Sequence, residues 1–206
     1  GLDEALSNVP GVYVANRYNY SLDQRLFIRG FGSRAAFGVR DLKVLLDGVP
    51  QTLPDGQSQL TNVDFANLQR IEVLRGASSS LYGNASGGVL AMTSEPAAPG
   101  PFSQSLRIEG GSFGLFKIQG RTTARRGPAS GVLSLSRTVV DGFRQHSRTE
   151  FTQLNLGGDY RLGSRTNLGV RFGYTAAPRA ENPGALTFAE VKANPDVIAA
   201  YLGTAH

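Results

Sequence analysis

The first half of the chain alternates short apolar runs with glycine- and proline-marked turns. Residues 2–7 predict a short amphipathic helix that Pro10-Gly11 ends, and residues 63–68 predict one or two helical turns. Asp47-Gly48 is a hairpin signal, because glycine takes a positive φ at little steric cost. Five apolar runs are short enough to be strands: 12–14, 26–29, 42–46, 70–75 and 88–93. This pattern predicts a small α+β unit.

The second half follows a stiff, proline-rich linker at 96–101 and has a different pattern. Five segments alternate apolar and polar residues with the period of two that defines a strand; Leu168, Val170 and Phe172, for example, alternate with polar or small residues. In a soluble sandwich the apolar side would face a core, whereas in a transmembrane barrel it would face lipid. Segments of about ten residues also suit a bilayer. Periodicity alone leaves both interpretations open. Because a barrel needs at least about eight strands, the barrel interpretation makes the chain a fragment.

Composition excludes several function classes. The 206 residues include no Cys and only two His, so thiolate chemistry, a His-built metal site and a Ser–His–Asp triad lack their side chains. No apolar run reaches the ~18–20 residues of a membrane-spanning helix. We therefore expect no catalytic residues, no metal site and no cofactor, and we do not expect an enzyme.

Charge is distributed unevenly along the chain. Residues 1–100 hold 8 Lys and Arg against 9 Asp and Glu, whereas residues 101–206 hold 13 against 7. An Arg-rich half could bind nucleic acid, or it could form a polar lumen with carboxylate pairs. The basic half lacks a basic helix and a stacking platform, so we expect no nucleic-acid partner.

The order of several motifs in the first half resembles the plug domain of TonB-dependent outer-membrane receptors. Each motif is weak alone, but the five in order, over about residues 2–95, are specific. They are Ala5–Val12, Ile28–Gly32, Val44–Pro50, Arg70–Gly76 and Ser79–Val89. Beyond the linker, Gly111–Gly114 and Asp141–Arg144 resemble the first hairpin and second outer loop of such barrels. Ala77 stands where many relatives carry proline.

The resemblance implies an α+β plug domain over 1–96, followed by antiparallel transmembrane β-barrel strands over 102–206, a fragment of a barrel of about 22 strands. It implies an outer-membrane location, in contact with outer-membrane lipid. It also implies import of a scarce ligand, most often a ferric siderophore, although haem, cobalamin, other metal chelates and glycans stay open. The energy would come through TonB, which would bind a segment upstream of residue 1.

The resemblance also assigns candidate residues to two roles. Arg29 and Arg75 would form ion pairs with barrel glutamates on strands outside this chain, with Glu72 as a local partner. Three plug loops, 16–21, 33–38 and 51–59, would face the outside and contact the ligand. Guanidinium groups and tyrosines suit an anionic, partly aromatic chelate. The loop candidates are Arg17, Tyr18, Tyr20, Arg34, Phe37, Gln51, Asp55 and Gln57.

The inward side chains of the barrel segments could contact the plug or line a hydrated path. These residues are Arg107, Glu109, Lys117, Gln119, Arg121, Asn155, Asp159 and Arg171. The competing hypothesis is a soluble, β-rich periplasmic binding module in which the five strands form a sandwich. The two hypotheses differ in what the apolar side chains of the second half face. They face a dry protein core in the sandwich and the surrounding lipid in the barrel.

Overall fold

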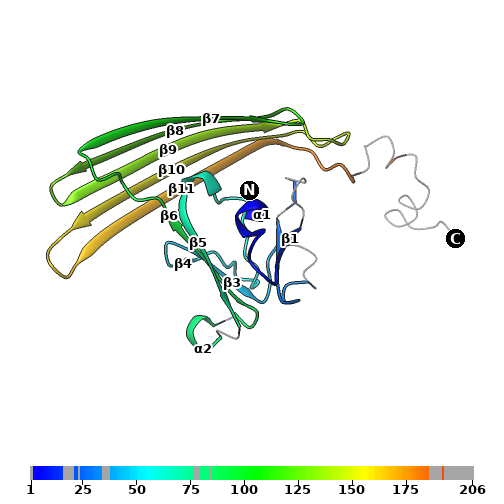
Figure 1. Ribbon diagram of the computed structural model, residues 1–206, viewed down its shortest axis with the longest axis horizontal. Helices are drawn as coiled ribbons and strands as arrows, with labels where there is room; N and C mark the ends of the chain where they lie inside the picture. Colours follow the sequence, from blue (N-terminus) through cyan, green and yellow to red (C-terminus); the bar gives the residue numbers. More distant parts are fainter. Residues whose placement is uncertain are drawn as a thin grey trace.

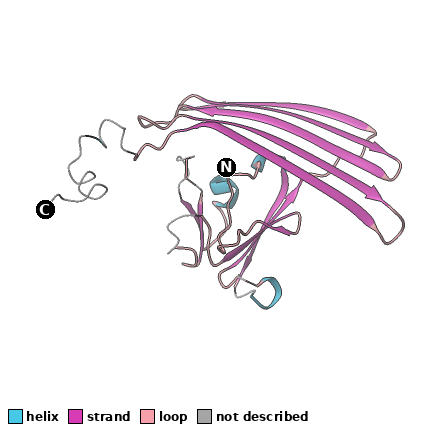
Figure 2. Ribbon diagram, turned by 180° about the vertical axis from the view of Figure 1, so that it is seen from behind, coloured by secondary structure: helices cyan, strands magenta, loops and turns pink. Residues whose placement is uncertain are grey.

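The computed structural model describes residues 2–15, 21–22, 24–33, 38–76, 79–83, 85–185 and 192. A long, curved sheet lies over a smaller globular part that we call the plug (Figure 1). The view from behind shows the same two layers, with the plug on the concave side of the sheet (Figure 2).

The plug consists of short elements, as the glycine-rich pattern predicts. A two-stranded antiparallel sheet pairs β1 with β2, and a second sheet has the strand order β4-β3-β6-β5, in which β3 and β6 are parallel. None of the described helices is long and apolar enough to cross a membrane. The elements are α1 (Leu2–Leu6), β1 (Val12–Ala15), β2 (Arg25–Ile28), β3 (Leu42–Leu46), β4 (Val49–Pro50), η1 (Phe65–Asn67), β5 (Leu68–Arg75), α2 (Ser79–Tyr82) and β6 (Gly88–Ser94).

The hydrophobic core lies inside the plug. It joins α1 to both sheets, because Leu2 and Leu6 pack with strand residues such as Val44 and Leu90, all of them buried. Burying one such side chain contributes about 1.5–3 kcal/mol. The other buried members of the cluster are Val14, Leu26, Ile28, Val39, Leu42, Leu60, Val63 and Met92.

Gly87 and Gly88 allow two parts of the plug to approach closely. A Cβ on Gly88 would lie 2.5 Å from the carbonyl oxygen of Leu74, and the φ of Gly88 is +136°. A Cβ on Gly87 would overlap the side chains of Phe31 and Leu42. Only glycine therefore fits where β6 begins beside β5.

The five predicted strands of the second half are confirmed as one antiparallel sheet, which we call the wall. Its strand order follows the chain, β7 to β11, so each strand pairs with its sequence neighbours. The strands are 10 to 14 residues long. They are β7 (Phe102–Gly111), β8 (Leu115–Arg126), β9 (Ala129–Val140), β10 (Thr149–Arg161) and β11 (Asn167–Ala180).

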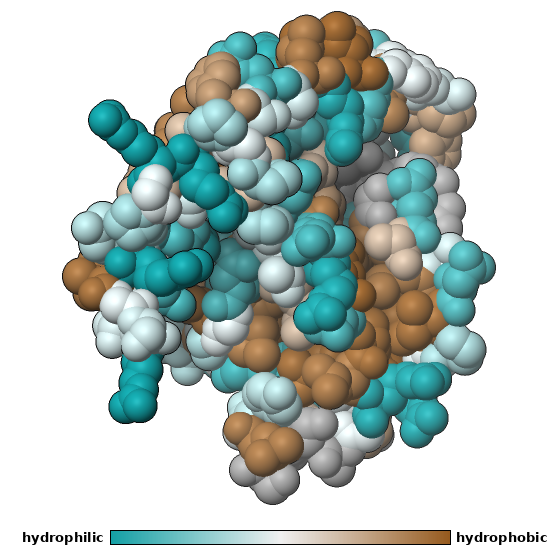
Figure 3. Space-filling view, turned by 60° about the vertical axis from the view of Figure 1, so that its left-hand side comes forward, coloured by the Kyte–Doolittle hydropathy of each residue, from teal (hydrophilic) through white to brown (hydrophobic). Residues whose placement is uncertain are grey.

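The wall is polar toward the plug and apolar on its outer side. On β9, Ser134 and Ser136 are buried, whereas Leu133 and Leu135, which alternate with them, are exposed. Exposed apolar side chains on the other strands include Leu106, Ile108, Phe116, Leu156, Leu168, Val170, Phe172 and Tyr174. The space-filling view shows one group of apolar side chains at its upper edge and a broader one below and to the right of its centre (Figure 3). The sandwich interpretation required these side chains to share a dry interior, and the structure shows that they do not.

The two ends of the wall differ in their connections. At one end, which we call the short-turn end, residues 127–128 and 162–166 join the strands. At the other, the long-loop end, residues 141–148 join β9 to β10. The two stretches that resemble receptor loops meet there: Phe113 and Phe143 lie 5.7 Å apart between ring centroids, and the amides of Asp141 and Gly142 donate to the carbonyl of Phe113.

The outward direction of the apolar residues can be tested with two neighbouring positions on β11. Phe172 pairs with Leu156 and is 54% exposed on the outer side, whereas Gly173 pairs with Asn155 on the inner side. In the full-length protein, Phe172→Arg places a guanidinium in hydrocarbon, which costs about 2–4 kcal/mol near the middle of a bilayer. We expect folded protein in outer-membrane fractions to fall several-fold for Phe172→Arg, as measured by heat-modifiable gel mobility. Gly173→Arg is the matched control and should assemble normally.

Candidate functional site at the seam between plug and wall

Asp64 joins the plug to two strands of the wall. One carboxylate oxygen lies 3.3 Å from Nζ of Lys117 on β8, and the other accepts hydrogen bonds from Ser136 Oγ on β9, at 3.3 Å, and from Gln119 Nε2, at 3.5 Å. Gln119 also donates to Ser134 Oγ, at 3.0 Å, which links the two strands. A single plug carboxylate is thus held by three wall side chains.

The local sequence positions this carboxylate. Asp64 is the N-cap of η1, and its side chain accepts a hydrogen bond from the amide of Ala66 at 3.2 Å. Val63 on one side belongs to the core, and Phe65 on the other packs against it. These neighbours fix the backbone of Asp64 at the plug surface beneath the wall, where its side chain is 1% exposed.

The segment between plug and wall is held by arginines of β8. Arg121 Nη2 donates to the carbonyls of Glu95 and Pro96 at 2.8 and 2.9 Å, and its guanidinium lies 3.6 Å from the Glu95 carboxylate. Arg125 donates to the carbonyl of Ala97 at 3.1 Å, and the amide of Ala98 donates to the Thr123 hydroxyl. The linker therefore lies along the inner face of β8.

A third contact lies nearer the short-turn end. The Asp47 carboxylate, in the turn between β3 and β4, lies 3.6 Å from Nε of Arg171 on β11. Its other oxygen accepts a hydrogen bond from the amide of Ser94 at 2.8 Å. Arg171 also makes a bidentate pair with Asp159 of β10, at 2.9 and 3.2 Å.

The three plug–wall ion pairs among the described residues have the same polarity. Asp64, Asp47 and Glu95 supply the acids, and the wall supplies Lys117, Arg171 and Arg121. Sequence reasoning named these three wall residues as possible plug contacts, but it missed the acids. The sequence did contain a signal for Asp64. It lies between the apolar residues Val63 and Phe65 at the start of a predicted helical turn, and such a position places a carboxylate beside the core.

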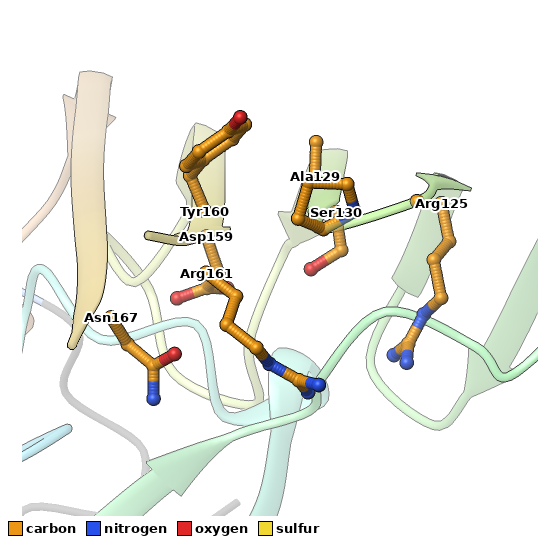
Figure 4. A pocket seen from close by; sticks show the side chains of 9 residues that line it. Arg125, Ala129, Ser130, Asp159, Tyr160, Arg161 and Asn167 are labelled. Carbon is orange, nitrogen blue, oxygen red and sulfur yellow. The ribbon is translucent and has the colours of Figure 1, made fainter. Parts of the chain in front are cut away.

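A pocket at the short-turn end collects further polar side chains. Arg125, Arg161 and Asn167 point to one side of the strands, and the ring of Tyr160 points to the opposite side (Figure 4). Asp159, which also lines the pocket, is already paired with Arg171. The pocket is therefore basic on the side that faces the plug.

Arg29 and Arg75 meet at the turn that follows α1. Arg75 Nη1 donates to the carbonyl of Pro10 at 3.2 Å, and the backbone amide of Arg29 donates to the carbonyl of Gly11 at 2.8 Å. Gly11 leaves room for the Arg29 side chain, whose Cγ would lie 3.3 Å from a Cβ added there. The expected barrel glutamates belong to strands outside this chain, so the ion pairs themselves stay a prediction.

Glu72 has a different partner from the expected one. Its carboxylate lies 3.0 Å from the guanidinium of Arg70, and both side chains are exposed. Successive side chains of a strand point to opposite faces, so Glu72 and Arg75, three residues apart on β5, do not share a face. The pair with Arg70 is a surface contact, worth about 0–1 kcal/mol.

Of the three predicted ligand loops, only the third is fully described. Gln57 donates two hydrogen bonds to the carboxylate of Asp55, from its backbone amide at 3.0 Å and from its side-chain Nε2 at 2.8 Å. Gln51 donates to the carbonyl of Val49 and accepts from Asn62. Ser58 bridges to Val39, so the loop returns to the start of β3, beside Gly38 at the end of the second loop. Arg17, Tyr18, Tyr20, Arg34 and Phe37 lie outside the described residues.

The long-loop end carries a network of ion pairs. Arg148 joins Asp141 and Glu150, at 2.9 and 3.0 Å, and Arg137 reaches the other oxygen of Glu150 at 2.8 Å. Beyond β11, hydrogen bonds from the Arg179 guanidinium and from the Arg148 amide hold the pKa of the Glu181 carboxyl below its usual value. The network holds the β9–β10 loop against the end of β11.

Comparisons with known proteins agree with this geometry. Residues 1–89 match the TonB-dependent Receptor Plug Domain. A second match, to a branched-chain amino acid ATP-binding cassette transporter over residues 187–206, covers too little of the chain to carry an argument. The vitamin B12 transporter BtuB of Photobacterium profundum is 30% identical over 68% of this chain and 22% of its own length. A hemin receptor of Yersinia enterocolitica is 26% identical over 87% of this chain and 27% of its own length.

A solved structure shows the same fold. The copper transporter OprC superposes with a TM-score of 0.68 at 17% identity, over 87% of this chain and 28% of that one. The chain thus spans roughly a quarter of the length of the proteins that it matches. It belongs to the TonB-dependent outer-membrane receptors, of which it carries the plug and the first strands of the barrel.

The role of Arg121 in holding the linker leads to a measurable prediction. Arg121→Met removes two charge-assisted hydrogen bonds to linker carbonyls, each worth about 1.5–3 kcal/mol. We expect amide hydrogen exchange of a peptide covering residues 95–101 to accelerate about tenfold or more in the full-length receptor. Arg137→Met, which removes a wall arginine far from the linker, should leave that peptide unchanged; equal exchange in both variants would show that Arg121 does not hold the linker.

Proposed function

We propose that the complete receptor imports a metal chelate across the outer membrane, and that this chelate is a ferric siderophore. Residues 1–96 act as the plug and residues 102–206 as part of the barrel. Energy enters through TonB, which binds a segment upstream of residue 1. Ligand binding from outside and force from TonB then rearrange the plug, so that a path opens.

The observation that carries this proposal is the two-sided wall with a plug on its polar face. A sheet that exposes Leu133, Leu135 and Phe172 on one side suits contact with hydrocarbon. Its other side buries Ser134, Ser136 and Gln119 against the plug. A channel closed by a separate folded part suits the uptake of a cargo that must be bound before it passes.

Chelate chemistry is supported by the relatives and by the predicted loops. Two of the relatives that match this chain are a vitamin B12 transporter and a hemin receptor, and vitamin B12 and hemin both hold a metal ion in an organic framework. Gln51, Asp55 and Gln57 supply polar groups in a loop closed by its own hydrogen bonds. We assign Arg17, Tyr18, Tyr20, Arg34 and Phe37 to the neighbouring ligand loops, where they can pair with anionic donors and stack on aromatic ones.

Arg29 and Arg75 belong to the plug's attachment rather than to ligand contact. Both lie at the Pro10–Gly11 turn, so two guanidinium groups can face one region of the remaining barrel. We propose that glutamates on the strands beyond this chain pair with them. Breaking one such buried pair would cost about 3–5 kcal/mol.

Uptake measurements in a strain that lacks the receptor gene test the substrate class. We expect growth on a single ferric siderophore as the only iron source, and uptake of that siderophore labelled with radioactive iron, to be lost. The same loss is expected in a strain without TonB, and a plasmid copy of the receptor should restore uptake only when TonB is present. Uptake of hemin and of cobalamin, measured in parallel, serves as the control.

Three outcomes would contradict the proposal at different levels. Loss of hemin or cobalamin uptake alone would assign the receptor to another chelate. Siderophore uptake that persists without TonB would refute the energy source. Recovery of the full-length protein in the soluble periplasmic fraction would favour the binding-module hypothesis instead.

A further inference from the structure

Asp64 is a buried charge that crosses the boundary between plug and wall. Its side chain is 1% exposed and that of Lys117 is 16% exposed, so water screens this pair weakly. The other two plug–wall pairs are more open, because Asp47 is 21% and Glu95 is 48% exposed. Among the described residues, Asp64 is the plug acid whose charge depends most on the wall.

Three of the four partners of the Asp64 carboxylate lie across the seam, on the wall, and the fourth is the backbone amide of Ala66. Oδ1 accepts from the Ala66 amide and faces Lys117, whereas Oδ2 accepts from Gln119 and Ser136. If the plug shifts away from β8 and β9, the carboxylate loses three wall partners and Lys117 loses its carboxylate. Burial of an unpaired charge is strongly unfavourable, so this contact selects one position of the plug.

The position of Asp64 in the chain extends this effect to the rest of the plug. It caps η1, which leads directly into β5, and β5 pairs along its length with β6. Strand β6 ends at Ser94, and the linker that follows is bound by Arg121. A fixed Asp64 therefore fixes β5 and β6 beneath the wall.

We propose that Asp64 is the plug-positioning residue of this receptor: held by Lys117, Gln119 and Ser136, it keeps the plug against β8 and β9 and keeps the pore closed. Its polarity is opposite to that of the plug arginines and barrel glutamates which the family resemblance implies. The inference requires a plug inside a barrel and is independent of which cargo is carried.

Permeability of the full-length receptor without cargo tests the proposal. Asp64→Asn preserves shape but leaves Lys117 without a carboxylate. We expect the population with a displaced plug to rise on the order of 100-fold. The readouts are channel openings in planar lipid bilayers and sensitivity of cells to vancomycin, each normalised to the amount of receptor at the cell surface.

A second substitution shows whether the effect comes from the Asp64–Lys117 charge pair or from packing alone. Lys117→Met alone should also leak, because it leaves the buried Asp64 carboxylate without its cationic partner. Asp64→Asn combined with Lys117→Met leaves two neutral side chains, and we expect its leak to return to within a few-fold of the unmodified receptor. Glu72→Gln removes a plug acid with no wall partner in the described structure and should not leak.

The proposal would be overturned if the Asp64→Asn receptor, present at its normal level at the cell surface, showed no increase in permeability. It would also be overturned if the permeability increases of the two single variants added up in the double variant. If Asp64→Asn prevents assembly, a chemical bridge decides the question in a receptor from which any cysteines beyond residue 206 have been removed; residues 1–206 contain none. Asp64→Cys with Ser136→Cys should leak when reduced and close when joined by a short bis-methanethiosulfonate. A leak unchanged by the bridge would show that this contact does not close the pore. Because no cargo is used, this result is independent of the uptake measurements.

Discussion

The alternation of side chains along a strand is the constraint on which the rest of this structure depends. Each wall strand must satisfy two environments at once, because neighbouring residues point to opposite sides. Leu133 and Leu135 require hydrocarbon, whereas Ser134 and Ser136, between and beside them on the same strand, require polar partners. The polar face of the sheet therefore packs against the plug, and its apolar face suits the hydrocarbon of the membrane.

The uneven charge of the chain has a structural explanation at the seam. The acids of the first half and the bases of the second half meet at Asp64–Lys117, Asp47–Arg171 and Glu95–Arg121. The three ion pairs differ in how much they stabilise the fit between plug and wall, because their carboxylates are buried to different extents. Exposed pairs contribute little, whereas a buried carboxylate is costly to leave without its partner. The basic residues of the second half, which could have indicated nucleic-acid binding, instead pair with acidic residues of the first half of the same chain.

The candidate site was predictable in part. The wall residues Lys117, Gln119, Arg121 and Arg171 were identified because a period of two places them all on one face. Asp64 was not: its position between Val63 and Phe65 indicates a place beside the core, but only the packing of plug and wall decides that it lies beneath that face. Glu72 was expected beside Arg29 and Arg75, and its carboxylate lies 3.0 Å from the guanidinium of Arg70, two residues earlier on β5.

The sequence by itself determined the elements of the fold and the family. Short apolar runs, glycine-marked turns and strict alternation are local properties, and local geometry follows from them almost residue by residue, as with β3 at Leu42–Leu46. Only the tertiary structure decided which side of the wall faces the plug and which acid meets which base. The physical reason is that these contacts join residues 26 or more positions apart, and 72 apart for Asp64 and Ser136, so that their meeting depends on how two independently patterned parts pack.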